Sequence, residues 1–314
     1  MAIDVRESAS SARMTGFSGG RSRHRREKAI KWVLMAAASL SVIISALIVW
    51  SLIGGAVSFV TQITLNHLSA DGWYPRRDEF GIATLFVGSL LVTGIACAIA
   101  VPIGLLSAIY LAEYASPRTR RVVKPILEIL AGIPSVVLGF FALTWISPSL
   151  VQRIQPDASD FNLAAAGIGV GILTIPLIAS ISEDSMRAVP RSLREASYGL
   201  GARRLTTSLR IVVPAALSGI VAAIILGVSR AIGETMVVAI AAGGSGGSQF
   251  TANPFDQGQT VTAAMAALST GTDQAVGSAA AFQSLFFLGL VLFLVTFALN
   301  QFGDFFVRRT RLRY

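Results

Sequence analysis

Cysteine, histidine and lysine are scarce in this chain, and each shortage excludes a kind of chemistry. Cys97 is the one cysteine among 314 residues, so an intrachain disulfide is impossible. His24 and His67 are the only histidines and stand far apart without ligand-like neighbours, so we expect no metal site. None of the three lysines follows a glycine. The chain therefore lacks a P-loop, whose lysine must reach a nucleotide's phosphates from a glycine-rich turn.

Charged residues are also few. They make up 14% of the chain against 53% hydrophobic residues, and the mean hydropathy is +0.66. That balance argues against a soluble protein of one or two domains. The apolar residues gather in six stretches long enough to cross a hydrocarbon core of ~30 Å, and none alternates as barrel strands do. We predict an all-α polytopic membrane protein with six transmembrane helices, at residues 32–60, 82–111, 126–146, 163–181, 211–242 and 284–302.

Smaller features mark how these spans pack. Pro102, Pro134 and Pro176 lie inside them and predict kinks that neighbouring helices or water must compensate. Gly167 and Gly171 form a small-xxx-small face, which predicts close helix packing. The segment 260–281 is rich in Ala, Ser, Thr and Gly and too weakly apolar to span, so we expect a surface or re-entrant helix there.

The net charge of +9 would suggest nucleic acid in a soluble protein, but here the placement of the charges is decisive. Most basic residues lie before residue 32, at 118–124, at 187–210 and after residue 307. With six spans these segments share one side, which the positive-inside rule makes the cytoplasm. We therefore expect both termini in the cytoplasm, no nucleic-acid partner, a disordered basic tail at 1–31 and a transmembrane domain at 32–314.

The longest cytoplasmic loop, about 183–214, has an organised pattern. Helix-forming residues run over 191–198, and Gly199 and Gly201 permit a sharp turn. A second short helix is expected to lead to Pro214 and the fifth span. This is a basic helix-turn-helix that projects from the membrane.

The loop resembles a family motif, the EAA loop of ABC-importer permeases. That motif has E-A-A, three residues, G, nine residues and I-x-L-P. The spacing here is the same, with a serine at the third position and Val213 in place of the leucine. The matching residues are Glu195, Ala196, Ser197, Gly201, Ile211 and Pro214.

The resemblance implies a function and partners. In this family the loop is a coupling helix that docks in a groove of an ATPase subunit. From about residue 71 onward, stretches such as KPILEILAGIPSVVLGFFAL and SRAIGETMVVAIAAG look like the phosphate-specific permeases, more like the PstC than the PstA family. The chain would then have the type I ABC importer permease fold, with its core at about 82–305, in a bacterial cell membrane. It would carry no cofactor and no catalytic residue of its own.

The partners implied by the resemblance form one machine. They are a second permease (PstA-like), an ATP-binding subunit dimer (PstB-like), which would hydrolyse ATP, an extracytoplasmic phosphate-binding protein (PstS-like) and inorganic phosphate. Three alternatives stay open: the same machine for another oxyanion, such as sulfate or molybdate; a stand-alone channel or secondary carrier; and an interaction or receptor subunit, which would retain function with Arg230 neutralised.

One charged pair falls deep within the fifth span. Arg230 and Glu234 are four residues apart, so on an unbroken helix they share a face and can pair. A charge at that depth costs roughly 2.5–3.5 kcal/mol and suggests a functional site. We expect Arg230, Glu234, Ser229 and Thr235 to line an anion path, the alternative being a structural pair at the contact with the partner permease. Glu128, in contrast, is expected about one turn from a cytoplasmic end, where it can snorkel.

Overall fold

The structure is a computed structural model that describes residues 21–64, 67–68, 70–244, 247–271 and 279–310. Within these residues five helices are long and apolar enough to cross a membrane, and a bent helix pair makes a sixth span if its two parts count as one. The predicted class, an all-helical membrane protein, is confirmed. The chain forms two units, divided after Trp50.

Helix α1 (Arg21–Gln62) begins well before the expected span at residue 32. Residues 21–31, which we expected in a disordered tail, are helical, whereas residues 1–20 lie outside the described part of the chain. The portion after Trp50 belongs to the larger unit. There Phe59 is buried, with its ring 5.0 Å from that of Phe80 and 5.3 Å from that of Phe287.

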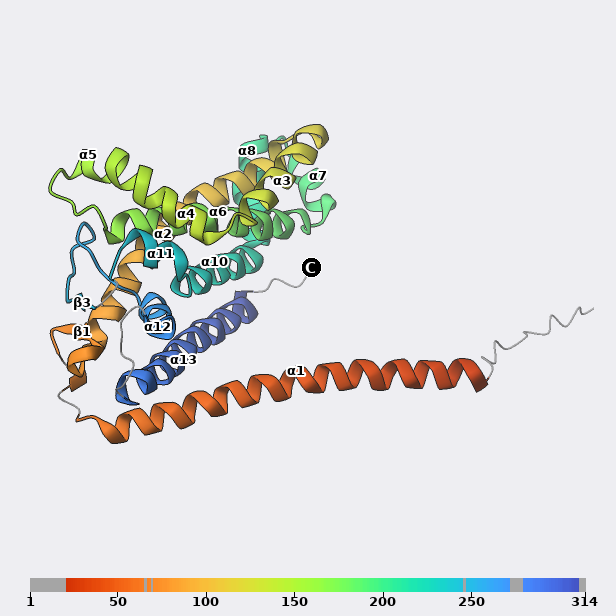
Figure 1. The fold of residues 1–314 in the computed structure, drawn as a ribbon. Helices are drawn as coiled ribbons and strands as arrows, with labels where there is room; N and C mark the ends of the chain where they lie inside the picture. Colours follow the sequence, from red (N-terminus) through yellow and green to blue (C-terminus); the bar gives the residue numbers. More distant parts are fainter. Residues whose placement is uncertain (1–20, 65–66, 69, 245–246, 272–278, 311–314) are drawn as a thin grey trace, which may run out of the picture. The chain divides into compact units, whose positions relative to one another are not determined.

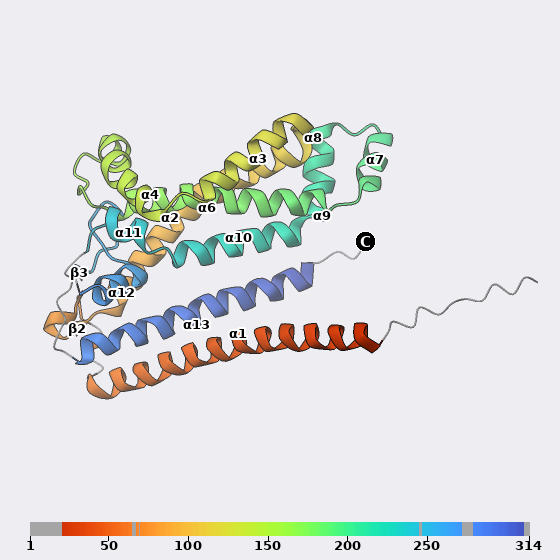
Figure 2. The same ribbon diagram turned by 45° about the vertical axis from the view of Figure 1, so that its right-hand side comes forward.

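Helices α2 (Ile82–Ile109) and α6 (Leu163–Arg187) form the centre of the larger unit and pack along each other (Figures 1 and 2). The predicted small-residue face makes this possible. A Cβ on Gly167 would meet the side chain of Ile95, and one on Gly171 would meet the backbone of Ala96. Helix α2 continues into a π-helical turn, η3 (Tyr110–Tyr114), at its end.

The expected third span is wrong in its position. Residues 126–131 belong to a separate helix, α3 (Pro117–Ala131), which ends at a break over residues 132–134. The span then runs through α4 (Ser135–Phe141), η4 (Ala142–Val151) and α5 (Gln152–Ile154). Pro134 explains the break, because it cannot donate a helical hydrogen bond and disfavours helix in the residue before it.

The expected fifth span is also broken, at two places. Helices α8 (Arg204–Thr207), η5 (Ser208–Val212) and α9 (Val213–Ala215) form one arm, which meets α10 (Leu217–Ile232) at a bend of 71°. A second break, at residues 233–235, separates α10 from α11 (Met236–Ala241). The single helix expected over 211–242 is therefore wrong.

The other end of the unit holds a small sheet and a short helix. Strand β1 (Gly72–Tyr74) lies between β2 (Glu79–Phe80) and β3 (Ser248–Gln249), antiparallel to both, with a 3-10 turn, η2 (Pro75–Arg77), between β1 and β2. Helix α12 (Val261–Ser269) has nine residues, too few to span, and it packs against α13 (Ala279–Thr310). This agrees with the non-spanning segment expected at 260–281, of which residues 272–278 lie outside the described part of the chain.

Candidate coupling loop and charged cavity

The loop between α6 and α10 folds as the predicted helix-turn-helix. Helix α7 (Arg191–Gly199) ends in a turn in which Gly201 has φ of +78°, and α8 follows. The Ala202 amide donates to the Ser197 carbonyl at 3.1 Å and closes the turn. The buried Ser197 hydroxyl lies 2.8 Å from the Thr207 hydroxyl, which joins α7 to α8. The serine that departs from the family motif thus makes a bond that alanine cannot.

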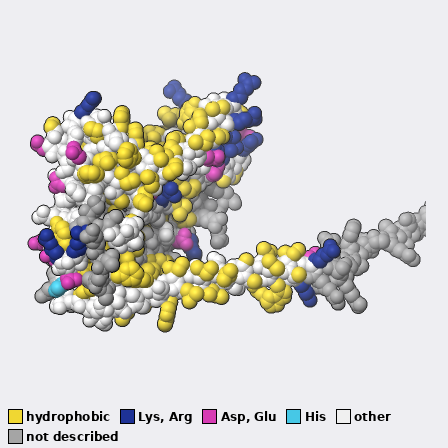
Figure 3. All heavy atoms as spheres, in the orientation of Figure 1, with side chains coloured by type: hydrophobic (Ala, Val, Ile, Leu, Met, Phe, Trp, Pro, Cys, Tyr) yellow, Lys and Arg dark blue, Asp and Glu magenta, His cyan; other side chains and the backbone are white. Residues whose placement is uncertain are grey.

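The remaining motif residues divide between surface and interior. Glu195, Ala196 and Pro214 are exposed, and Ile211 is half-buried. The neighbouring Leu200 is 90% exposed at the tip of the turn. Figure 3 shows Lys and Arg side chains gathered at this end of the larger unit, around α3, α7 and α8. The tip of the turn thus presents an apolar side chain to solvent, close to basic residues.

A buried ion pair fixes α7 to the rest of the unit. The Arg194 guanidinium donates to the Glu113 carboxylate of η3 through Nε at 3.1 Å and Nη2 at 2.9 Å. The same guanidinium donates to the carbonyls of Met186 and Val189, at 2.8 and 2.7 Å. The Glu113 side chain is 3% exposed and that of Arg194 is 15% exposed. One side chain therefore ties α7 to the ends of both central helices.

A second cluster joins α3 to α6. Glu183 is fully buried and accepts a hydrogen bond from Lys124 Nζ at 2.8 Å, and the same ammonium donates to Asp184 at 2.6 Å. Arg120 and Arg187 lie 3.7 and 3.8 Å from the Glu183 carboxylate. Burial alone would lower the pKa of Lys124, but its hydrogen bonds to Asp184 and Glu183 outweigh this and raise it. Lys124 therefore stays protonated and paired at neutral pH.

The turn at Gly201 offers a test of the loop's rigidity. A Cβ added at Gly201 would meet nothing within 4 Å, so only the positive φ resists substitution. We expect Gly201→Ala to cost about 1–2 kcal/mol of loop stability and to lower transport per ATP hydrolysed. Gly199→Ala is the matched control, because Gly199 has equal space but helical backbone. Equal coupling ratios in both variants would contradict a role for this turn.

The four residues expected to share an anion path do not lie together. Because α10 ends at Ile232, Arg230 and Glu234 are not on one helix face, and within the described residues no ion pair joins them. The expected pairing is wrong. The Glu234 carboxylate instead accepts from the Val237 amide at 3.4 Å, in α11, and its carbonyl accepts from the Thr262 hydroxyl at 2.7 Å.

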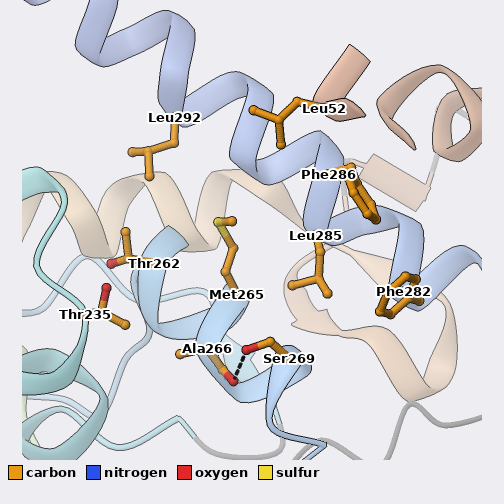
Figure 4. Close-up of a pocket in the computed structure, with 10 residues that line it drawn as sticks. All are labelled: Leu52, Thr235, Thr262, Met265, Ala266, Ser269, Phe282, Leu285, Phe286 and Leu292. Atoms are coloured by element: carbon orange, nitrogen blue, oxygen red, sulfur yellow. Dashed lines mark hydrogen bonds between the residues drawn. The ribbon is translucent and has the colours of Figure 1, made fainter. Parts of the chain in front are cut away.

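The other two expected residues face different elements. The Ser229 hydroxyl donates to the Asn300 side chain of α13 at 3.2 Å. Thr235 lines a separate pocket of 440 Å³ between α11, α12 and α13, shown in Figure 4. That pocket is walled by Leu, Phe and Met side chains, with the Thr235 and Thr262 hydroxyls on one side, and none of the described residues that line it is charged.

Arg230 lines a different cavity, of 270 Å³, formed with α3 and α6. It is exposed in this chain and makes no hydrogen bond or ion pair with any described residue. A guanidinium without a partner in the last turn of a spanning helix must face water or protein rather than lipid. The cavity also contains one carboxylate, that of Glu128, which the sequence alone did not connect with Arg230.

A helix-turn-helix loop joined to a bundle of candidate spans is consistent with the comparisons. The model of the family described as binding-protein-dependent transport system inner membrane component matches residues 100–312. The chain belongs to this family, the membrane-spanning permeases of ABC importers.

Individual members of the family show which permeases this chain is similar to. The phosphate transport system permease protein PstC of Mesorhizobium japonicum is 30% identical over 88% of this chain and 89% of its own length. The probable ABC transporter permease protein YqgH of Bacillus subtilis is 35% identical over 66% of this chain, a match that spans 64% of YqgH. The phosphate transport system permease protein PstA 1 of Mycobacterium tuberculosis (strain H37Rv) is 36% identical over 62% of this chain and 61% of its own length.

Solved structures share the fold. A bacterial alginate ABC transporter in complex with an alginate-bound periplasmic protein aligns with a TM-score of 0.64 at 15% identity, over 91% of this chain and 97% of that one. A second structure of a bacterial alginate importer gives 0.62 at 17% identity, over 91% and 99%. The expected type I ABC importer permease fold is confirmed.

Proposed function

We propose that this chain forms part of the anion path of an ATP-driven phosphate importer in a bacterial cell membrane. The observation that carries the proposal is the unpaired Arg230 guanidinium at the end of a spanning helix, lining a cavity. A planar guanidinium fits phosphate oxygens through two parallel hydrogen bonds. The similarity to phosphate permeases over most of the chain supports phosphate as the cargo.

The proposed machine has four kinds of subunit. This chain would pair with a second permease, whose surface would cover the exposed Arg230 face. An ATPase dimer would bind the α7 tip at Leu200, and an extracytoplasmic binding protein would deliver phosphate. The Arg194–Glu113 pair would then transmit the movement of α7 to the ends of α2 and α6, because it is buried and bonded at both ends.

Uptake in a reconstituted system tests this function. The complete complex in proteoliposomes should take up labelled phosphate only when the ATPase subunits, ATP and the phosphate-binding protein are all present. Uptake that persists without the ATPase would identify a channel or secondary carrier instead. Uptake of sulfate or molybdate, but not phosphate, with the cognate binding protein would identify the importer of another oxyanion.

The proposed orientation has both termini in the cytoplasm, motivated by the clustering of basic residues. A reporter enzyme that is active only outside the cytoplasm should be silent when fused after Tyr314 and active when inserted at Gly246. Both fusion points lie outside the described residues. A reporter active at the C-terminus would reverse the assignment of every loop.

A further inference from the structure

Glu128 lies near the end of α3 and lines the same cavity as Arg230. Helix α3 has its basic residues near its start, and Glu128 stands near the opposite end, beside the break at residues 132–134. The structure places Glu128 on the wall of the cavity that Arg230 lines, and the expectation that it snorkels to a cytoplasmic end stays a prediction. Its side chain is exposed and forms no hydrogen bond or ion pair within the described chain.

Three polar side chains without partners face the cavity that Arg230 lines. Glu128 comes from α3, Ser180 from α6 and Arg230 from α10, and α6 packs against both other helices (Figures 1 and 2). No described residue forms a hydrogen bond with the Ser180 hydroxyl. The remaining lining is apolar and comes mainly from α6, including Leu173, Pro176 and Leu177. The cavity thus holds a cation, an anion and a neutral donor on three separate elements.

The size of the cavity suits a small hydrated ion. At about 30 Å³ for each water in the liquid, 270 Å³ holds a tetrahedral oxyanion with several waters. Glu128 and Arg230 are more than 4.0 Å apart at their charged atoms, since they form no salt bridge, although opposite charges in an apolar cavity attract strongly. Their separate helices keep them apart and leave both free for a ligand.

We propose that Glu128 makes this cavity selective for a protonated oxyanion, hydrogen phosphate, over a fully deprotonated one such as sulfate. The proposal rests on the anion path proposed above. Inorganic phosphate keeps at least one P–OH group at neutral pH, and this hydroxyl donates to the Glu128 carboxylate, which can only accept. The charged phosphate oxygens accept from Arg230 and Ser180.

Sulfate is excluded by the same carboxylate. It has no proton at neutral pH, so it offers Glu128 no donor and places negative charge against negative charge. A site that bonds a substrate hydroxyl discriminates strongly against an analogue without one, because the site's polar group is left unpaired. Discrimination by an unfavourable contact with the wrong ligand is a general route to specificity.

Direct binding to the complete complex in lipid nanodiscs, without the binding protein, tests this selectivity. Labelled inorganic phosphate and sulfate are titrated separately. Wild type should prefer phosphate, and Glu128→Gln should lower the phosphate-to-sulfate affinity ratio by about 10- to 100-fold. The neutral amide oxygen accepts the P–OH hydrogen bond more weakly than a carboxylate, the repulsion of sulfate is lost, and the amide N–H can donate to sulfate. Glu128→Asp, which keeps the carboxylate, should retain part of the preference. Asp157→Asn, an exposed loop carboxylate outside the cavity, is the matched control and should change nothing.

The variants distinguish a failure of the selectivity proposal from a failure of the anion-path proposal on which it rests. Arg230→Gln should weaken both anions together. If it leaves both affinities unchanged, the anion path itself is refuted, and the role of Glu128 with it. If Arg230→Gln weakens binding but Glu128→Gln leaves the ratio unchanged, the selectivity proposal alone is overturned. Wild-type complex that binds phosphate no better than sulfate also overturns it.

Discussion

Replacing Arg230 with glutamine is expected to lower phosphate uptake roughly 100-fold or more while the importer still assembles. The substitution keeps hydrogen bonding and much of the bulk but removes the positive charge that Arg230 gives to the cavity. Losing a charged partner in such a site costs about 2–5 kcal/mol. Arg230→Lys should recover part of the uptake, because it restores the charge without the planar fork. Uptake is measured in proteoliposomes at saturating binding protein, and assembly by co-purification with the ATPase.

Two controls sharpen this result. Arg153→Gln removes an exposed arginine in α5 that has no bonded partner among the described residues, and should leave uptake unchanged. Adding Glu234→Gln to Arg230→Gln should not restore function, because the break at residues 233–235 separates the two charges. Restored uptake in that double variant would show that the pair forms after all and that Arg230 has a structural role.

Replacing Arg194 with methionine is expected to uncouple the importer and to destabilise it by about 3–5 kcal/mol. The change leaves the buried Glu113 carboxylate without its cation, the situation in which breaking a buried pair is most costly. It also frees two carbonyls at the end of α6. We expect a lower unfolding temperature of the purified complex and ATP hydrolysis with little phosphate transport.

A second substitution distinguishes stability from coupling. Arg194→Met with Glu113→Gln removes both charges and should recover much of the lost stability, since no buried ion remains unpaired. Coupling should stay poor, because the bond between α7 and η3 is still missing. Arg191→Met, on the exposed side of α7, is the matched control. Normal coupling in the Arg194→Met variant would exclude the pair as the link.

Local sequence patterns predicted the helix-turn-helix of the loop between α6 and α10 well. The helix-turn-helix depends on helix formers followed by Gly201, and the structure places both where the spacing indicated, with positive φ at the glycine. Most spans were recognised because a long uninterrupted apolar stretch is by itself evidence for a span, but the expected third and fifth spans were wrong in position or continuity. The ion pairs that join distant segments of the chain could not be predicted from local patterns. Arg194 and Glu113 are 81 residues apart, and Lys124 and Glu183 are 59 apart.

Hydropathy predicted a wrong span boundary at the junction of α3 and α4, because no polar loop separates these two helices. The apolar end of α3, with Ile126, Leu127 and Ile129, runs directly through residues 132–134 into α4, so the sequence reads as one span. Because the fifth helix was assumed to be unbroken, Arg230 was expected to pair with Glu234. The shared cavity of Arg230 and Glu128 was therefore not predicted. A break changes which residues share a face, and each error about the candidate site follows from a missed break.

The bend of 71° before α10 determines what kind of motion this span can make. The first arm, residues 204–215, is closer to perpendicular than to parallel to the second arm, α10. A displacement along the first arm therefore has only a small component along the axis of α10. Most of the displacement must tilt α10 about the bend instead of sliding it. Over 16 residues, about 24 Å at 1.5 Å per residue, a tilt moves the far end of the helix through the widest arc. Arg230 lies at that end, so a small rotation at the bend displaces the guanidinium more than most other residues of α10.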